Sequence, residues 1–332
     1  MDKKILILMA TYNGQLYIKK QLDSICNQSL KDWKLIIRDD GSSDETIEII
    51  REYCKKDGRI HLVCNETSLH GAYQNFWALI DYAKKNEDFD YCFFSDQDDI
   101  WPIYKLELMT SNAAQYDQDI PLLEYGDMQI INEKDEIVEN SLNEIMGIGH
   151  MSGYTQFYSA AFVWGCNMMI NRKLIDIINV FPLNHPAIHR MSHDNYYTKV
   201  CLITGNVIYV PKPCLLHRRH TNNVTSGNHL KLSLRMILNK FLFGFSELCQ
   251  THANGYAQTL FTLECMENAG IKSNETNLIK KAILNGGVNG CRIMIKHHVK
   301  RFQISRSVGI YFVMFVKGYR KYLNKILREE KL

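Results

Sequence analysis

Short apolar segments alternate with amphipathic segments over the first hundred residues of the chain. The apolar segments are rich in branched and aromatic residues, a pattern typical of strands that are buried on both faces. Between them, apolar residues recur at the three-to-four-residue spacing of helices that cover a sheet. This alternation predicts an α/β fold with a mostly parallel, doubly wound sheet. The predicted strands are 5–9, 33–38, 60–64 and 91–95, and the predicted helices are 15–28, a segment after Ser42, and 73–84.

The second half of the chain alternates less regularly. Polar, Gly-containing residues at 140–160 predict a loop that faces the site, and Pro211 and Pro213 are expected to end the last strand. From residue 230 onward every segment has helical spacing. The predicted strands are 122–131, 162–170 and 206–210, and the predicted helices are 172–178, 193–202, 230–250, 255–268, 275–298 and 306–328.

Polar clusters follow three of the predicted strands. Ligands of a parallel sheet bind beyond the carboxyl ends of its strands, so we expect these clusters to share one edge. The first strand is followed by neither GxGxxG nor GxxxxGK[ST], which argues against a dinucleotide-dependent oxidoreductase and against a P-loop enzyme. The clusters are Thr11-Tyr12-Asn13, Asp39-Asp40 and Asp96-Gln97-Asp98-Asp99.

The last of these clusters has the chemistry of a cation site. Neighbouring carboxylates such as those of Asp96, Asp98 and Asp99 repel one another unless a cation lies between them. Hard oxygen ligands suit Mg²⁺ or Mn²⁺, which usually also bind substrate phosphates. The alternative is an acidic turn that caps the next helix.

The acidic pair after the second strand has two possible roles. Ser42 and Glu45 have the spacing of a capping box, so Asp40 is not needed to cap the helix that follows. We therefore predict that Asp40 accepts hydrogen bonds from a ribose or a base edge. Asp39 is either functional or structural.

Two further motifs lie in the second half. Asp194, which follows His193, opens a predicted helix and could act as general base towards a hydroxyl; the alternative is a carboxylate that stabilises the helix N-terminus. The basic segment 217–220 could donate to a diphosphate or contact a metal; the alternative is a solvated basic loop.

Composition narrows the class of protein. The 332 residues are 46% hydrophobic and 23% charged, which excludes a disordered or collagen-like chain. The ten cysteines include no CxxC pair, so the sequence indicates neither a zinc knuckle nor a thioredoxin-like site. The first apolar run is too short for a signal peptide, and a cytoplasmic location is expected.

Charge is distributed unevenly along the chain. Residues 229–332 carry 17 Lys and Arg against 6 Asp and Glu, a net charge of +11, which leaves −8 for residues 1–228 of a chain whose formal net charge is +3. The basic amphipathic segments 231–245 and 305–328, whose longest apolar run is too short to span a bilayer, predict a contact with a membrane surface. The alternatives are packing against the rest of the chain and a homodimer interface. Nucleic acid is not an expected partner, because no binding motif accompanies the charge.

Three motifs taken together resemble the family 2 inverting glycosyltransferases of the GT-A fold. The last of them, together with Arg218-x-His220-x-x-Asn223, resembles the bacterial rhamnosyltransferase subgroup, which builds cell-wall polysaccharide and O-antigen. The resemblance covers about residues 3–225. The three motifs are Ala10-Thr11-Tyr12-Asn13-Gly14, Arg38-Asp39-Asp40-Gly41-Ser42-Ser43-Asp44 and Ser95-Asp96-Gln97-Asp98-Asp99-Ile100-Trp101.

The resemblance implies a GT-A catalytic domain over residues 1–228, with a nucleotide-sugar half at about 1–100 and an acceptor half at about 101–228. A basic helical module at 229–332 would follow. The implied partners are a nucleotide-sugar donor (dTDP-L-rhamnose or a UDP-sugar), Mn²⁺ or Mg²⁺, and a glycan acceptor that could be lipid-linked. A peripheral position at the inner face of the cell membrane would suit such an acceptor.

The resemblance also implies a role for individual residues. Asp194 would be the catalytic base, and His193 takes the place of the acidic neighbour that the family usually has. Cys166 stands where glycine is common. The implied nucleotide-sugar contacts are Ala10, Thr11, Tyr12, Asn13, Asp39, Asp40, Gly71, Asp96, Gln97 and Arg218; the metal ligands are Asp96, Asp98 and His220; and the acceptor contacts are Trp101, Gly165, Cys166 and His193.

The implied reaction is one displacement with inversion at the anomeric carbon. Asp194 takes the proton of the acceptor hydroxyl, and the metal neutralises the departing diphosphate. One alternative is a non-catalytic nucleotide- or glycan-binding subunit of an assembly complex. Another is a nucleotidyltransferase that makes the activated sugar, but such enzymes generally need a glycine-rich and basic loop after the first strand, which this sequence lacks.

Overall fold

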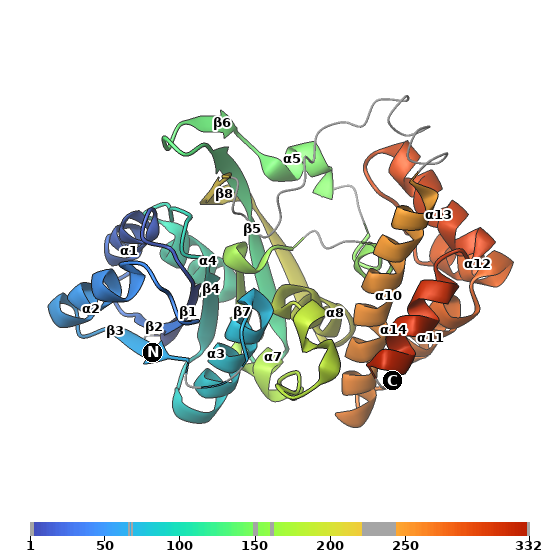
Figure 1. The fold of residues 1–332 in the computed structure, drawn as a ribbon, viewed down its shortest axis with the longest axis horizontal. Coiled ribbons are helices and arrows are strands. Elements are labelled where there is room, and N and C mark those ends of the chain that lie inside the picture. Colours follow the sequence, from blue (N-terminus) through green and yellow to red (C-terminus); the bar gives the residue numbers. More distant parts are fainter. Residues whose placement is uncertain are drawn as a thin grey trace.

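A computed structural model describes residues 3–65, 67, 69–148, 152–159, 163–220 and 244–330. Within these residues a mixed sheet of eight strands lies at the centre, and the C-terminal helices pack together beside it (Figure 1). The expected boundary at residues 228 and 229 lies outside the described residues, as does nearly all of the basic segment 231–245.

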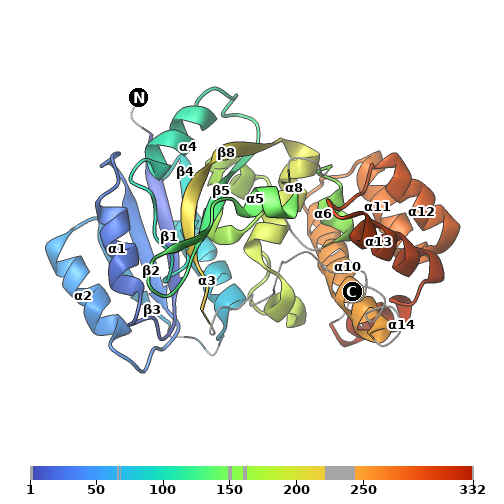
Figure 2. The ribbon, with the colours of Figure 1, turned by 90° about the horizontal axis from the view of Figure 1, so that it is seen from above.

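Four parallel strands form one half of the sheet. They lie in the order β3 (Ile60–Cys64), β2 (Lys34–Asp39), β1 (Ile5–Thr11) and β4 (Tyr91–Ser95). The three inner strands are buried almost throughout because helices cover both faces of the sheet. In Figure 2, α1 (Ile18–Cys26) and α2 (Thr46–Lys56) lie on one face and α3 (Ala72–Asn86) on the other, which is the predicted doubly wound arrangement.

The other half of the sheet mixes directions. β7 (Met168–Asn171) runs antiparallel to β4 and to β5 (Leu122–Ile131), while β8 (Asn206–Arg218) runs parallel to β5. β6 (Ile137–Glu139) pairs with the end of β5. The other elements before residue 220 are α4 (Lys105–Ala113), α5 (Leu142–Met146), α6 (Thr155–Tyr158), α7 (Arg172–Asp176), α8 (His193–Thr204), and the 3-10 turns η2 (Gly165–Asn167) and η3 (Pro186–Arg190).

The prediction that prolines end the last strand is wrong. β8 continues through Pro211 and Pro213 to Arg218, and its pairing with β5 shifts register between Gly126 and Met128. Such bulges leave positions outside the regular hydrogen-bond ladder, where a proline without an N–H group is tolerated. This extension carries the basic segment to the edge where β4 ends.

Two other local predictions are also wrong. Ser42 does not cap α2, since the N-cap is Glu45 and makes no side-chain capping bond. Ser42 is used instead to bind Asp39, as described below. The predicted strand at 162–170 begins only at Met168, because the preceding residues Gly165–Asn167 form η2.

Five helices make up the described part after residue 243. The predicted break between the helices 230–250 and 255–268 is wrong, because the single helix α10 runs through it. Gly255 lies within this helix, and an added side chain there would meet nothing within 4 Å. The predicted helices 275–298 and 306–328 are each divided in two. Backbone φ angles of +58° at Gly286 and +59° at Lys317 lie in the left-handed region that ends helices. The five are α10 (Phe245–Asn268), α11 (Asn274–Asn285), α12 (Gly287–Lys296), α13 (Ile304–Val316) and α14 (Arg320–Glu329).

The first of these helices, α10, packs against α8 and α6 and joins the helical layer to the sheet. Among the residues that the structure describes, no helix is long and apolar enough to cross a membrane. All ten cysteines lie in described segments and are free, and Cys64 is the exposed one among them.

Candidate active site

The loops after β1, β2 and β4 meet at the carboxyl edge of the sheet, at the point where the strand order reverses between β1 and β4. The side-chain amide of Gln97 donates to the carbonyl of Tyr12 and accepts from its N–H group, both over 2.9 Å. The Ser42 hydroxyl accepts from the N–H group of Asn13 over 2.8 Å. The three polar clusters predicted from the sequence are therefore brought together.

Asp39 shapes the loop that follows β2. Its carboxylate is 2% exposed and accepts from the Thr11 hydroxyl over 2.9 Å and from the N–H groups of Gly41 and Ser42 over 3.0 and 2.8 Å. The Ser42 hydroxyl also donates to it, over 2.6 Å. These four bonds come from the chain itself and support the structural alternative for Asp39.

Asp40 connects the same loop to the start of α3. One of its oxygens accepts from the Asn65 amide over 2.7 Å and the other from the N–H group of Gly71, also over 2.7 Å. Gly71 has a φ of +115°, a conformation that favours glycine. The structure thus brings two of the predicted nucleotide contacts, Asp40 and Gly71, into one hydrogen-bonded unit, and their contact with a nucleotide stays a prediction.

The acidic cluster after β4 is crowded. Carboxylate oxygens of Asp96, Asp98 and Asp99 lie within 4.8 Å of one another. Burial and the two neighbouring carboxylates raise the pKa of Asp96 to about 8. Burial and the Asp99 carboxylate also raise the pKa of Asp98. Carboxylates that resist ionisation in this way are the environment that a divalent cation stabilises.

His220 reaches the same cluster from the residues beyond β8. Its Nε2 atom lies 2.7 Å from an oxygen of Asp98, and its ring stacks on Tyr17 with ring centroids 5.1 Å apart. Carboxylate and imidazole together are ligands that Mn²⁺ accepts, and Mg²⁺ accepts the carboxylates. Of the predicted ligands, Asp96 and Asp98 lie in one carboxylate cluster that suits a divalent cation, and His220 contacts Asp98; binding of a cation by all three stays a prediction.

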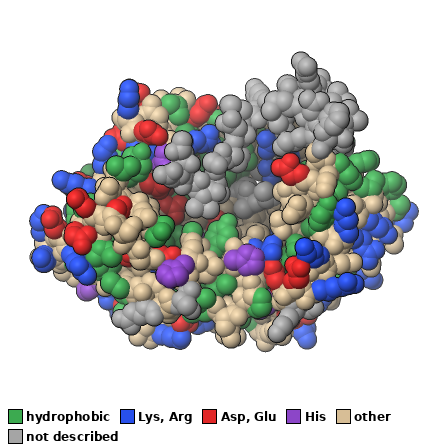
Figure 3. Space-filling model, in the orientation of Figure 1, with side chains coloured by type: hydrophobic (Ala, Val, Ile, Leu, Met, Phe, Trp, Pro, Cys, Tyr) green, Lys and Arg blue, Asp and Glu red, His purple; other side chains and the backbone are tan. Residues whose placement is uncertain are grey.

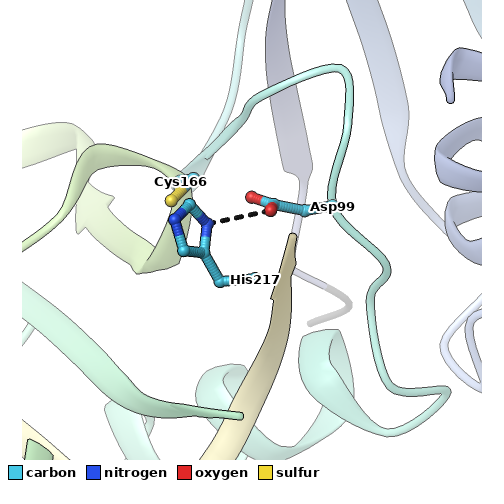
Figure 4. Close-up of side chains that lie close together, drawn as sticks. All are labelled: Asp99, Cys166 and His217. Carbon is cyan, nitrogen blue, oxygen red and sulfur yellow. Dashed lines mark hydrogen bonds and ion pairs between the residues drawn. The ribbon is translucent and has the colours of Figure 1, made fainter. Parts of the chain in front are cut away.

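Asp99, the third carboxylate of the cluster, is fully buried. One oxygen accepts from the N–H group of Arg218 over 3.0 Å and lies 2.9 Å from Nδ1 of His217 (Figure 4). The other oxygen has no hydrogen-bond partner. Burial opposes charge on both groups, but their mutual attraction raises the pKa of His217 to about 8 and helps to hold the pKa of Asp99 below its usual value. This pair is therefore charged and anchors the end of β8 to the acidic loop.

Arg218 is also fully buried. Its Nε group donates to the carbonyl of Asp98 over 2.8 Å, its Nη1 group donates to the carbonyl of Asn132 over 3.0 Å, and it forms an ion pair with Asp135. The guanidinium lies over the ring of Tyr17 at 4.6 Å. In this arrangement the Arg218 side chain is hydrogen-bonded to the backbone of the acidic loop. Its contact with a diphosphate stays a prediction.

Asp194 lies at the first turn of α8, as predicted. One of its oxygens accepts from the N–H group of Gly165 over 3.1 Å. The next residue, Cys166, lies against the acidic cluster, where its thiol hydrogen-bonds to Asp96 and burial raises its pKa. The short turn η2 therefore joins the candidate base to the candidate metal ligands.

His193 fills the space beside this turn. Its ring lies between Phe76 and Phe94, at 4.3 and 4.6 Å between ring centroids, and neither ring nitrogen has a hydrogen-bond partner. Burial lowers the pKa of His193 to about 4, so the ring is neutral. A β-carbon at Gly165 would lie 2.5 Å from Nε2 of His193, which explains why glycine is required there.

Trp101, the remaining predicted acceptor contact, is buried like Cys166 and His193. It is 2% exposed and packs against Phe93, with Nζ of Lys105 4.0 Å from its ring centroid. This is the environment of a core residue, and its contact with an acceptor stays a prediction.

Sequence reasoning missed two buried lysines near the site. Lys105 donates to the carbonyl of Cys166 over 3.1 Å, and burial lowers its pKa to about 8. Lys199 on α8 is 1% exposed; burial lowers its pKa to about 7, against the opposing effect of Asp194. A lysine within a helical segment ordinarily indicates a solvated face, so the sequence carried no signal for either residue.

Comparison with known proteins agrees with this geometry. Residues 6–178, more than half of the chain, match glycosyl transferase family 2. The dTDP-rhamnosyl transferase RfbG of Shigella flexneri is 29% identical over 229 residues, which cover 66% of this chain and 74% of RfbG. The UDP-Glc:alpha-D-GlcNAc-diphosphoundecaprenol beta-1,3-glucosyltransferase WfgD of Escherichia coli is 27% identical over 216 residues, which cover 62% of this chain and 72% of WfgD.

The fold is similar to that of S. aureus TarS 1-349 in complex with UDP-GlcNAc. The TM-score is 0.53 at 14% sequence identity, over 98% of this chain and 92% of the TarS chain. At this identity the likeness concerns the fold alone, and it confirms the predicted GT-A fold. The sheet edge, the acidic cluster and the sequence match agree: the chain belongs to glycosyl transferase family 2.

Proposed function

We propose that this glycosyltransferase moves a sugar from a nucleotide diphosphate to a glycan hydroxyl with inversion, and that Asp194 is the base. The observation that carries the proposal is the turn η2. Gly165 binds Asp194 over 3.1 Å while Cys166 lies against the acidic cluster. A donor diphosphate at the cluster and an acceptor hydroxyl at Asp194 would then meet at this turn.

The chain's own groups supply most of the reaction. Asp96, Asp98 and His220 would hold a divalent cation, which when bound neutralises the diphosphate leaving group. The acceptor oxygen forms its bond to the anomeric carbon as the bond from that carbon to the diphosphate breaks. Asp194 takes the hydroxyl proton and releases it to solvent. A single displacement needs no covalent sugar–enzyme intermediate, so a second carboxylate nucleophile is not required.

We further propose dTDP-L-rhamnose as the donor, supported by the similarity to the dTDP-rhamnosyl transferase RfbG. A UDP-hexose is the alternative donor, because the sequence is nearly as similar to WfgD, whose name specifies UDP-Glc. Nucleotide release from a panel of dTDP-rhamnose, UDP-glucose, UDP-galactose and UDP-N-acetylglucosamine distinguishes the two. Fastest release from a UDP-sugar would overturn the rhamnosyl assignment.

The base is tested by replacing Asp194 with asparagine. Asp194→Asn keeps the size of the side chain and should bind donor as tightly as wild type while acceptor-dependent release falls by about 10³-fold. Asp176→Asn, which changes an exposed aspartate on α7, is the matched control. Undiminished turnover of Asp194→Asn rejects the assignment of the base.

We also propose that the helical layer lies against an anionic lipid surface, which would suit a lipid-linked acceptor. Apolar side chains are exposed on α12 and α13, and basic side chains lie beside them on the same layer (Figure 3). Such a surface complements anionic headgroups above an apolar interior. The apolar set is Val288, Ile295, Ile304, Val308 and Phe315, and the basic set is Arg292, Lys296, Lys300, Lys317 and Lys321.

Sedimentation with vesicles tests this surface. Binding to vesicles that contain phosphatidylglycerol should be lost in Ile304→Ser/Val308→Ser and in high salt, and phosphatidylcholine vesicles should bind weakly. Val138→Ser, at an exposed apolar residue of β6, is the control. A stable dimer that is broken by the same double variant would instead support the predicted homodimer interface and overturn the lipid contact.

A further inference from the structure

The segment that leads to Asp194 is held between two parts of the molecule. On one side, the indole N–H group of Trp77 on α3 donates to the carbonyl of Met191 over 2.6 Å. On the other side, η3 and the start of α8 contact α10 and the end of α14. The base is therefore positioned in part by residues more than fifty positions away along the chain.

The strongest of these contacts is an ion pair at the last described residue. Nε of Arg190 lies 2.9 and 2.8 Å from the two carboxylate oxygens of Glu330, and Nη2 lies 2.5 Å from one of them. Nη1 of Arg190 donates to the Asn254 side chain on α10 over 2.8 Å. The side chains of Arg190 and Glu330 are only 19% and 7% exposed. This is a bidentate, nearly buried pair, the geometry in which arginine fixes direction as well as distance.

A chain of amides continues from this pair to the residue after the base. The Gln258 side chain on α10 donates to the carbonyl of Arg190 over 2.5 Å and also hydrogen-bonds to the Asn195 side chain. Asn195 accepts in turn from Gln156 on α6 over 2.8 Å. Because Asn195 directly follows Asp194, the first turn of α8 is hydrogen-bonded to the C-terminal helix α10 as well as to α6 and η2.

We propose that Arg190 and Glu330 are positioning residues that set the orientation of Asp194 towards the acceptor hydroxyl. The proposal rests on the proposed role of Asp194 as base. A nearly buried ion pair contributes little to net stability compared with an apolar pair of the same volume, whereas it strongly restricts geometry. The C-terminal helices then help to position the base, in addition to any contact that they make with lipid.

The test is the kinetics of Glu330→Ala with the donor that the panel identifies. We expect kcat to fall about ten-fold, because small displacements of a catalytic group have large effects on rate, while the KM for donor stays within about two-fold of wild type. Gln258→Leu, which leaves the ion pair in place but removes the amide contacts, should have a smaller effect of the same kind. Glu267→Gln, which breaks the half-exposed pair with Lys280 in the same helical layer, is the matched control and should leave kcat unchanged.

Combination with Asp194→Asn separates positioning from general stability. If Glu330 acts through the base, Glu330→Ala adds no further loss of kcat once Asp194 is asparagine. An equal loss in both backgrounds, an unchanged kcat, or a loss that Glu267→Gln shares would overturn the proposal. Full turnover of Asp194→Asn alone would overturn the proposed base instead, so the two failures are distinguishable.

Discussion

The acidic clusters after β2 and β4 lie on one edge of the sheet but differ in how their charge is balanced. Asp39 accepts four hydrogen bonds from its own chain, and Asp40 accepts from a side-chain amide and a backbone N–H group. In the cluster after β4, carboxylates face one another, and one oxygen of Asp99 has no hydrogen-bond partner.

This difference separates two kinds of carboxylate cluster on one edge of the sheet. A carboxylate whose oxygens are occupied by donors of its own chain shapes a loop, and its removal affects folding. Crowded carboxylates with a raised pKa are an environment that a cation stabilises, so we expect their removal to affect binding and rate. The predictions below test this distinction, beginning with the largest expected effect.

Removing Asp98 should affect catalysis most. In Asp98→Ala, metal-stimulated transfer should fall by about 10³-fold, because the cation that neutralises the leaving group loses a ligand. EDTA should have a comparable effect on wild type, and added Mn²⁺ should restore wild type only. Asp32→Ala, at an exposed aspartate, is the control. If wild type stayed active in EDTA, the cluster after β4 would not need a cation, and the distinction between the two clusters would be wrong.

Removing Asp39 should affect folding instead. Asp39→Ala leaves buried donors without an acceptor and should lower the free energy of unfolding by about 3 kcal/mol, measured by urea denaturation. Mn²⁺ should still raise the melting temperature of this variant, as in wild type, whereas it should have no effect on Asp98→Ala. A variant with normal stability but no donor binding would show that Asp39 belongs to the binding cluster.

The residues beside Asp194 offer a third test, with a buried imidazole in place of a carboxylate. Phe76 and Phe94 surround His193, Asp194 is its charged neighbour, and burial lowers the pKa of His193 from 6.5 to about 4. The unfolded chain therefore binds the proton more tightly, and stability that is full above pH 6.5 is lost as the pH falls towards 4.

Between pH 7.5 and pH 5, wild type should lose about 2 kcal/mol more stability than His193→Leu, measured by urea denaturation. His61→Leu, at an exposed histidine of β3, should keep the acid sensitivity of wild type. Equal acid sensitivity of wild type and His193→Leu would show that the buried His193 ring does not cause the loss of stability at low pH.

The smallest effect is expected at Gln97, which lies between two of the crowded carboxylates in sequence but is fully paired with Tyr12. Gln97→Ala should lower the free energy of unfolding by about 1 kcal/mol and leave the response to Mn²⁺ intact. Loss of the Mn²⁺ response would mean that the pairing of Gln97 supports the cation site as well.

The parallel half of the fold could be predicted from the sequence because its inner strands are apolar on both faces. The predicted strands 5–9, 33–38 and 91–95 correspond to β1, β2 and β4. The antiparallel direction of β7 could not be predicted, since a four-residue strand carries no signal for the direction of its neighbour. The passage of β8 through two prolines depends on bulges in its pairing with β5, which is a tertiary feature.

The residues of the candidate site could be picked out from the sequence where several of them formed a motif. The sequence indicated Asp96, Asp98 and Asp194, and the structure links them through Gly165 and Cys166. It could not indicate the pairing of Asp99 with His217, because the two lie more than a hundred residues apart. The ion pair between Arg190 and Glu330 could not be predicted either, because these two residues are also more than a hundred positions apart.

Cys64, at the end of β3, has a practical consequence for measurement. It is the exposed thiol among ten free cysteines, and it directly precedes Asn65, whose amide binds Asp40. Burial raises the pKa of thiols elsewhere, such as Cys92 and Cys201, and so reduces their thiolate fraction. A maleimide dye should therefore attach first at Cys64, giving a fluorescent reporter beside the loop that contains Asp40 without replacing any other cysteine.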